Sequence, residues 1–70
     1  MEFSEKIKKT REILKISQEA LARELNVSFA TINRLEKEKT MPSYSTLKIF
    51  EDFCKKNNIE FKDWGGYNEK

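Results

Sequence analysis

Apolar positions recur at helical spacing twice in quick succession between Ser17 and Leu35, in the run SQEALARELNVSFATINRL. In the first segment the apolar stripe reaches Leu25, and in the second Ile32 and Leu35 lie three residues apart, as on one face of a helix. A serine precedes each segment, and serine is a preferred N-cap because its hydroxyl accepts a hydrogen bond from the first helical turn. We therefore predict two helices, over Gln18 to Leu25 and over Phe29 to Lys37.

The connection between these two predicted helices leaves no room for a loop. Asn26 directly follows the first apolar stripe, and Asn tolerates the left-handed backbone conformation that often ends a helix. Val27 then turns back toward the interior. Helices joined by so short a turn cross at a steep angle, which is the helix-turn-helix arrangement, and its second helix can enter the major groove of DNA. The residues on the exposed side of this second helix are Phe29, Ala30, Asn33 and Lys37.

The segment before the motif also has a helical pattern. Ser4 is predicted to cap a helix that runs to about Leu14, with Ile7, Ile13 and Leu14 inward and the lysines outward. This helix gathers positive charge, in Lys6, Lys8, Lys9, Arg11 and Lys15. Acidic residues fall mostly later in the chain, on Glu51, Asp52, Glu60, Asp63 and Glu69. The distribution predicts a basic face and an acidic face.

A further helix is predicted after the motif. Pro42-Ser43 ends the preceding element and caps this helix, which fades at Asn57-Asn58. Its apolar positions are Leu47, Ile49, Phe50 and Phe53. Ile59, Phe61 and Trp64 then predict a short final turn or helix that closes the core, and Gly65-Gly66 begins a polar tail. We expect an all-α domain over residues 1–64 and a polar tail over residues 65–70.

Length and composition narrow the classes of function. A chain of 70 residues forms one domain, and at this size roughly 60% of the unfolded surface is buried, so we expect a small core and no large catalytic cleft. One cysteine, Cys54, and no histidine exclude a disulfide framework and a His/Cys zinc site within one chain. The chain also lacks a clustered carboxylate pair and a glycine-rich phosphate loop. We expect no enzyme activity, no cofactor and no metal.

The net charge is less informative than the distribution of charged residues along the chain. The net charge of +2, from 14 Lys and Arg against 12 Asp and Glu, is by itself weak evidence for a nucleic-acid partner. No apolar run approaches the length of a membrane span, and nothing resembles a signal peptide. We expect a cytoplasmic protein with no membrane partner.

Several positions agree in type and spacing with one known family. They are Arg11, Ser17-Gln18, Leu21-Ala22, Leu25, Val27-Ser28, Thr31-Ile32, Leu35-Glu36 and Pro42-Ser43. With these residues the chain resembles the Xre family, the lambda repressor and Cro-like helix-turn-helix domains, over about residues 5 to 64. The resemblance implies five helices, binding to double-stranded operator DNA as a homodimer, and transcriptional repression.

The resemblance also implies roles in DNA binding for residues of the motif. Gln18 is expected to contact a phosphate or the edge of the outermost base pair. Phe29 and Ala30 are expected to face the bases, where a thymine methyl group is an apolar partner, whereas Asn33 can pair with adenine and Arg34 can read guanine or hold a phosphate. The expected phosphate contacts are Ser28, Lys37, Lys39, Thr40 and Tyr44.

Other implied roles concern the fold and its assembly. Arg11 and Glu36 are expected to form an ion pair that ties the first helix to the second helix of the motif. The dimer interface is expected to involve Ile59, Phe61, Trp64 and Tyr67, because four large apolar residues in nine positions are more than a terminal turn needs.

One departure from the family pattern concerns the end of the second motif helix. Glu38 stands where the family usually has a glycine in a left-handed turn. Either the helix ends differently here, or Glu38 carries a strain of roughly 1 to 2 kcal/mol.

A second class of function stays open. The same fold can serve as a protein-interaction module, such as an antitoxin or an accessory subunit, whose motif or C-terminal aromatic residues contact a toxin or another protein. The small net charge and the apolar Phe29 favour this alternative. Affinity for DNA falls steeply with added salt, whereas an apolar protein interface barely responds, so salt dependence separates the two classes.

Overall fold

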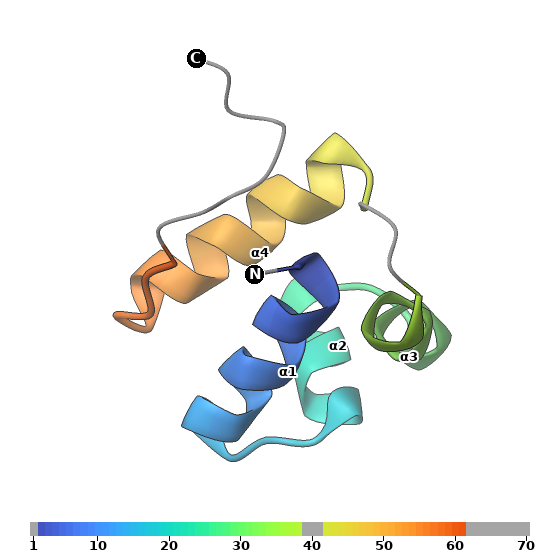
Figure 1. Ribbon diagram of the computed structural model, residues 1–70, viewed down its shortest axis with the longest axis horizontal. Helices are drawn as coiled ribbons and strands as arrows, with labels where there is room; N and C mark the ends of the chain where they lie inside the picture. Colours follow the sequence, from blue (N-terminus) through green and yellow to red (C-terminus); the bar gives the residue numbers. More distant parts are fainter. Residues whose placement is uncertain (1, 39–41, 62–70) are drawn as a thin grey trace.

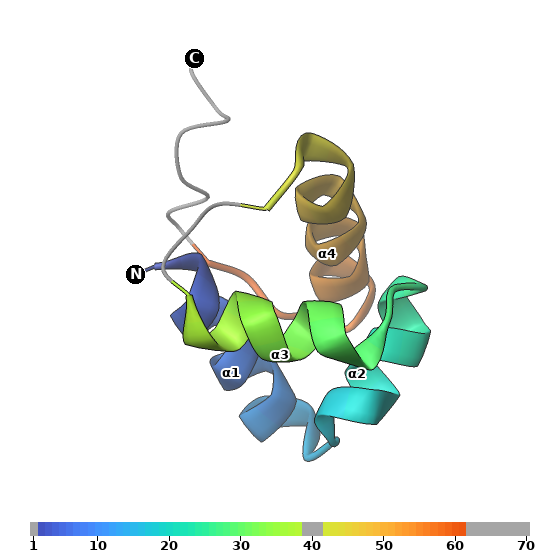
Figure 2. The ribbon, with the colours of Figure 1, turned by 90° about the vertical axis from the view of Figure 1, so that its right-hand side faces the viewer.

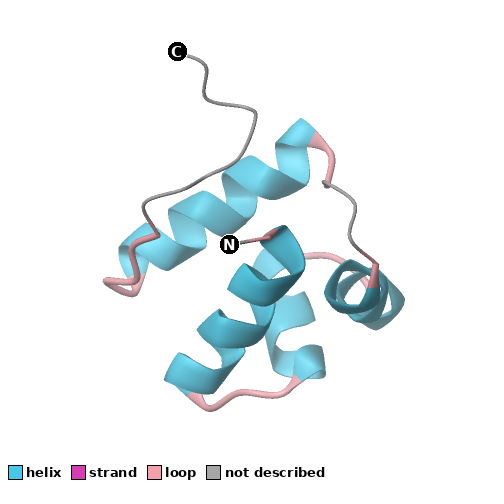
Figure 3. Cartoon of the chain, viewed as in Figure 1, coloured by secondary structure: helices cyan, strands magenta, loops and turns pink. Residues whose placement is uncertain are grey.

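The computed structural model describes residues 2–38 and 42–61, and over these residues it contains four helices and no strands (Figure 1, Figure 3). The helices are α1 (Phe3–Leu14), α2 (Gln18–Leu25), α3 (Phe29–Lys37) and α4 (Tyr44–Lys56). Helix α3 packs against α1 and α2, and α4 packs against α2. The predicted all-α class and the predicted bounds of α2 and α3 are confirmed.

Serine N-caps begin three of the four helices. The Oγ atoms of Ser17, Ser28 and Ser43 each accept a hydrogen bond from the backbone N–H three residues later, at 3.0, 3.1 and 3.2 Å. Each bond satisfies one of the backbone donors that a helix start leaves without an intrahelical partner. The starts of α2, α3 and α4 could therefore be predicted from the local sequence.

Helix α1 begins earlier than its sequence indicates. Its N-cap is Glu2, and the backbone N–H of Glu2 donates to the carboxylate of Glu5 at 3.3 Å in a capping box. Ser4 is buried inside the helix, so the prediction that Ser4 caps it is wrong. The pair of glutamates provides the cap in place of the serine.

The ends of α2 and α3 have different backbone conformations. Asn26 adopts the left-handed conformation, with φ 59° and ψ 43°, and ends α2 as predicted. Glu38 is extended, with φ −97° and ψ 144°, and its N–H donates to the carbonyl of Arg34 at 2.8 Å. Helix α3 therefore ends without the left-handed turn, and Glu38 carries no left-handed strain.

Among the described residues the core is an apolar cluster to which all four helices contribute. The rings of Phe3 and Phe50 meet edge to face with centroids 5.2 Å apart, which joins the start of α1 to the middle of α4. The buried apolar residues are Phe3, Ile7, Leu21, Ala22, Leu25, Ile32, Leu35, Leu47, Phe50, Cys54 and Ile59.

The inward stripe of α1 differs from the predicted one. Ile13 is 50% exposed, whereas Lys6 is only 2% exposed and Thr10 is fully buried. The stripe that faces the core starts at Phe3 and passes through Ile7 and Thr10, so Ile13 falls outside it. The buried stem of Lys6 carries its ammonium to 6.0 Å from the ring centre of Phe61. The prediction of an inward Ile13 and of uniformly outward lysines is wrong.

Helix α4 and the chain after it also require corrections. Leu47, Phe50 and Cys54 form the buried stripe of α4, and Ile49 lies off it and is exposed. The helix ends at Lys56, as predicted, and Ile59 then returns to the core. Within the part of the chain that the structure describes, no fifth helix follows α4, so the five-helix count is not confirmed. Trp64 and residues 65–70 lie outside the described residues.

Two isoleucines of α1 test this packing. We expect Ile7→Val to lower the free energy of unfolding by about 0.5 to 1.5 kcal/mol, because it removes a methyl group from a filled core. Ile13→Val is the matched control and should change it by less than about 0.5 kcal/mol, because Ile13 is half exposed. Urea unfolding monitored by circular dichroism measures both. Equal losses in the two variants would contradict the observed orientation of α1.

Candidate nucleic-acid interface

Helix α3 lies at the surface, and one side of it faces away from the rest of the molecule (Figure 2). Its buried residues are Ile32, Leu35 and Glu36. Phe29 is 50% exposed on the opposite side. We call this side the outer face of α3 and define it by Phe29, Ala30, Asn33, Arg34 and Lys37, of which Asn33 is half-buried and the others are exposed.

The outer face of α3 is basic although the chain is nearly neutral. Arg34 and Lys37 are the cations of α3, and both are exposed. Glu36 is the single carboxylate within α3, and it is turned inward with its side chain 6% exposed. The outer face therefore presents two positive charges, neutral polar groups and an aromatic ring, a combination that suits phosphates and base edges.

The expected phosphate contacts are only partly within the described residues. Ser28 and Tyr44 are both exposed, at the N-cap of α3 and in the first turn of α4. The hydroxyl of Ser28 lies 2.9 Å from that of Thr31 in addition to its capping bond. Lys39 and Thr40 lie outside the described residues. The structure thus places Ser28 and Lys37 at the two ends of α3.

A hydrogen-bonded cluster behind α3 holds the helix in place. The carboxylate of Glu36 receives Nε of Arg11 on Oε2 at 2.6 Å and Nη2 of Arg11 on Oε1 at 3.0 Å. Nη1 of Arg11 also donates to the carbonyl of Ile16 at 3.3 Å. The expected ion pair between Arg11 and Glu36 is therefore present, in the bidentate geometry that arginine forms with a carboxylate.

Gln18 is the third member of this cluster. Its Nε2 donates to Oε1 of Glu36 at 2.9 Å, and its side chain is half-buried. We call Arg11, Gln18 and Glu36 the Glu36 cluster. From the family resemblance Gln18 is expected at the DNA, and its bond to Glu36 is not predicted. No local signal indicates this bond, since 18 positions separate the two residues.

The Glu36 cluster shifts the acidity of both charged groups. Burial acts to raise the pKa of Glu36, but hydrogen bonds from Arg11 and Gln18 outweigh it, so the pKa is lower than usual. The pKa of Arg11 is raised, mainly by its hydrogen bond to Glu36. The cluster therefore keeps Glu36 ionised and Arg11 protonated.

The four residues expected at a dimer interface differ in burial, and two of them lie outside the described residues. Ile59 is 5% exposed and packs in the core, so it is unavailable to a partner, and its assignment to the dimer surface is corrected. Phe61 is half-buried and lies near Lys6. Trp64 and Tyr67 lie outside the described residues.

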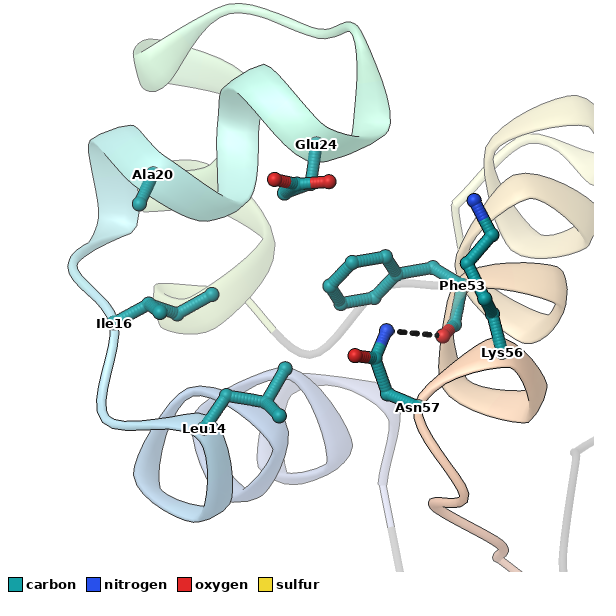
Figure 4. Close-up of a pocket in the computed structure, with 7 residues that line it drawn as sticks. All are labelled: Leu14, Ile16, Ala20, Glu24, Phe53, Lys56 and Asn57. Atoms are coloured by element: carbon teal, nitrogen blue, oxygen red, sulfur yellow. Dashed lines mark hydrogen bonds between the residues drawn. The ribbon is translucent and has the colours of Figure 1, made fainter.

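A groove of about 280 Å³ lies where the last turns of α1 and α4 approach α2 (Figure 4). Phe53 lies at its centre, and the Nδ2 of Asn57 donates to the carbonyl of Phe53 at 2.8 Å. The other lining residues are Leu14, Ile16, Ala20, Glu24 and Lys56. No residue of α3 lines this groove, so it is separate from the outer face of α3.

The structure assigns Cys54 to the core. The thiol is buried, lies 3.7 Å from Oγ1 of Thr10, and has a pKa raised by its burial. Among the described residues no group of three or more His, Cys, Asp or Glu side chains is placed to hold a metal ion. Every helix within residues 2–38 and 42–61 is too short or too polar to cross a membrane.

The tight α2–Asn26–α3 turn and the basic outer face of α3 define a helix-turn-helix protein. A family model described as helix-turn-helix matches residues 7–57, which is most of the chain. The chain belongs to this family, of the Xre and lambda repressor-like type, whose members are DNA-binding domains. No curated protein and no solved structure matches the chain.

The lowered pKa of Glu36 predicts a pH-dependent contribution to stability. A carboxyl group with a lowered pKa in the folded state stabilises the fold above its unfolded pKa, about 4.3, and this contribution is lost as the pH falls through the folded pKa. We expect Glu36→Gln to be less stable than the wild type by about 1 to 3 kcal/mol at pH 7. The difference should shrink as the pH falls below about 4.3.

Urea unfolding of both proteins at neutral pH and at several acidic values measures this difference. Glu24→Gln removes an exposed carboxylate and is the control, with an expected change within about 0.5 kcal/mol. A Glu36→Gln deficit that stays constant down to the lowest pH would show that the charge of Glu36 is not what stabilises the fold.

Proposed function

We propose that this chain is a sequence-specific transcriptional regulator that binds double-stranded DNA with α3 in the major groove. Residues 1–64 form the DNA-binding domain, and residues 65–70 are a polar tail. The protein acts in the cytoplasm as a repressor. The observation that carries this proposal is the outer face of α3, the second helix of the helix-turn-helix. This face is mostly exposed, carries two positive charges and contains no carboxylate.

The chemistry of the outer face suits both apolar and polar base edges. Phe29 and Ala30 are exposed at the start of α3 and suit the methyl group of thymine. Asn33 has the donor and acceptor that adenine requires, and Arg34 has the donors that guanine requires. Each good base contact contributes about 1 to 3 kcal/mol of discrimination.

Contacts to phosphates supply affinity that does not depend on sequence. Ser28 lies at a helix N-terminus, where the backbone amides and helix dipole favour an anion, and Lys37 supplies a cation at the other end of α3. Tyr44, Lys39 and Thr40 complete the proposed phosphate contacts. Such contacts make affinity fall as salt rises.

A single nine-residue helix reads too few base pairs for selectivity in a genome. We therefore propose a homodimer on a two-fold symmetric operator, with half-site centres about 34 Å apart. The proposed dimer surface includes Phe61, Trp64 and Tyr67.

The second candidate function is a protein-interaction module, such as an antitoxin or an accessory subunit. The half-exposed ring of Phe29 favours it, because an exposed aromatic ring is a common anchor in protein interfaces. The partly apolar groove around Phe53 is a second surface that favours it. Binding through either surface would respond weakly to salt, in contrast to DNA binding.

Selection of bound duplexes from a random DNA library tests the two candidates. The purified chain is incubated with the library at two salt concentrations, and bound duplexes are sequenced. Enrichment of a two-fold symmetric motif, with weaker recovery at high salt, is the result expected of a dimeric DNA reader. Failure to enrich any motif at low salt would favour the protein-interaction module.

Two substitutions on the outer face test base readout. We expect Asn33→Ala and Arg34→Ala each to weaken binding to the selected duplex by about 1 to 3 kcal/mol, because each removes a base contact. Lys55→Ala deletes an exposed cation of α4 and serves as the charge-matched control for Arg34→Ala. Fluorescence anisotropy on the selected duplex gives the affinities. Unchanged affinity in both outer-face variants would refute the assignment of this face.

A further substitution tests the proposed dimer. We expect Trp64→Ala to weaken self-association, because a large aromatic side chain is removed from a segment that is otherwise mostly polar. Base preference should be unchanged. Analytical ultracentrifugation and repeated library selection measure the two properties, and a variant that dimerises as well as the wild type would refute the role of Trp64.

A further inference from the structure

We infer that Gln18 is a positioning residue for DNA recognition, which acts by holding Glu36 and so fixing the rotation of α3 about its own axis. The inference rests on the proposed function and assigns Gln18 a role other than direct base reading. The observation behind it is the hydrogen bond from Nε2 of Gln18 to Oε1 of Glu36, at 2.9 Å.

The Glu36 carboxylate is held from two different helices. Arg11 donates to both of its oxygens from α1, and Gln18 donates to one of them from the first turn of α2. Glu36 itself lies in the last turn of α3 with its side chain 6% exposed. Three charge-assisted donors on a nearly buried carboxylate fix its position and direction more tightly than apolar contacts do.

Apolar packing holds the inner side of α3 without directional bonds. Ile32 and Leu35 are buried on this side by hydrophobic contact, which is not directional, whereas the hydrogen bonds to Glu36 are. The end of α3 adds no left-handed capping turn, because Glu38 leaves the helix in an extended conformation. The Glu36 cluster is thus a directional restraint on the C-terminal half of α3.

Small rotations of α3 matter for base recognition. A side-chain tip about 6 Å from the helix axis moves by about 1 Å when the helix rotates by about 10°. A paired hydrogen bond to a base edge tolerates little of this displacement, because donor and acceptor must stay within about 3.2 Å. Asn33 lies about one turn before Glu36 on the same helix. A rotation of α3 that changes the direction of the Glu36 side chain therefore also moves the side chain of Asn33 on the outer face.

Gln18 is suited to this role by its neutral amide. It donates to Glu36 without adding a second cation beside Arg11, and a glutamate at the same position would repel Glu36. The competing role is a direct contact between the amide of Gln18 and a phosphate. The two roles differ in one respect: a phosphate contact strengthens binding to every duplex, whereas positioning of α3 strengthens binding to the recognised sequence only.

The test compares two duplexes, the one selected from the library and a scrambled duplex of the same composition. Gln18→Met keeps the side-chain length and removes the donor. We expect about a tenfold loss of affinity for the selected duplex and less than about a twofold loss for the scrambled one. Glu19→Gln, at the neighbouring exposed position of α2, is the control and should leave the ratio of the two affinities unchanged. Thermal melting verifies that every variant is folded at the assay temperature.

A double-mutant cycle strengthens the comparison. If Gln18 acts through Glu36, Gln18→Met combined with Glu36→Gln reduces the affinity ratio no more than Glu36→Gln alone. An affinity ratio that is unchanged in Gln18→Met would overturn the positioning role, and equal losses on both duplexes would then indicate a direct phosphate contact. Losses of the ratio that add in the double variant would also overturn it, because Gln18 would then act independently of Glu36. A wild-type chain that shows no preference between duplexes would instead overturn the proposed function, and the inference with it.

Discussion

Helix α3 has nine residues, and a helix of this length is not stable alone in water. Its existence depends on what holds its inner side. Ile32 and Leu35 supply buried apolar area against α1 and α2, and Glu36 supplies a directional bond to both helices. Because the inner side supplies these contacts, the outer face of α3 stays mostly exposed.

The Glu36 cluster also explains how a nearly neutral chain presents a basic face. Taking a carboxylate out of water is costly, and the donors of Arg11 and Gln18 offset that cost. Arg11 remains partly exposed at 25%, which lowers its own desolvation cost. The single acidic residue of α3 is thus withdrawn from the surface, and the local charge of the outer face is set by Arg34 and Lys37 alone.

Features set by local sequence could be predicted, and features set by distant contacts could not. The serine caps and the left-handed Asn26 follow from chemistry within one helical turn, so the bounds of α2 and α3 were predictable. Ile13 was misplaced because the apolar pattern of α1 fits two overlapping stripes, and contact with α4 selects the stripe of Phe3 and Ile7. The outer face of α3 could be predicted from the helical spacing of the apolar residues Ile32 and Leu35, which identifies the opposite side as exposed. The bond of Gln18 to Glu36 could not, because it depends on how α2 and α3 cross.

The pairing of Thr10 with Cys54 has a consequence for how the chain folds. These residues are 44 positions apart, so their contact closes a loop that contains the entire helix-turn-helix motif, α2 and α3. Closing such a loop costs on the order of 3 kcal/mol beyond a constant, because loop entropy grows with the logarithm of length. Contacts between α2 and α3 are local and need no such closure. The helix-turn-helix motif is therefore the part of the molecule that needs the least loop closure, and the docking of α4 on α1 and α2 is the step that costs the most loop entropy.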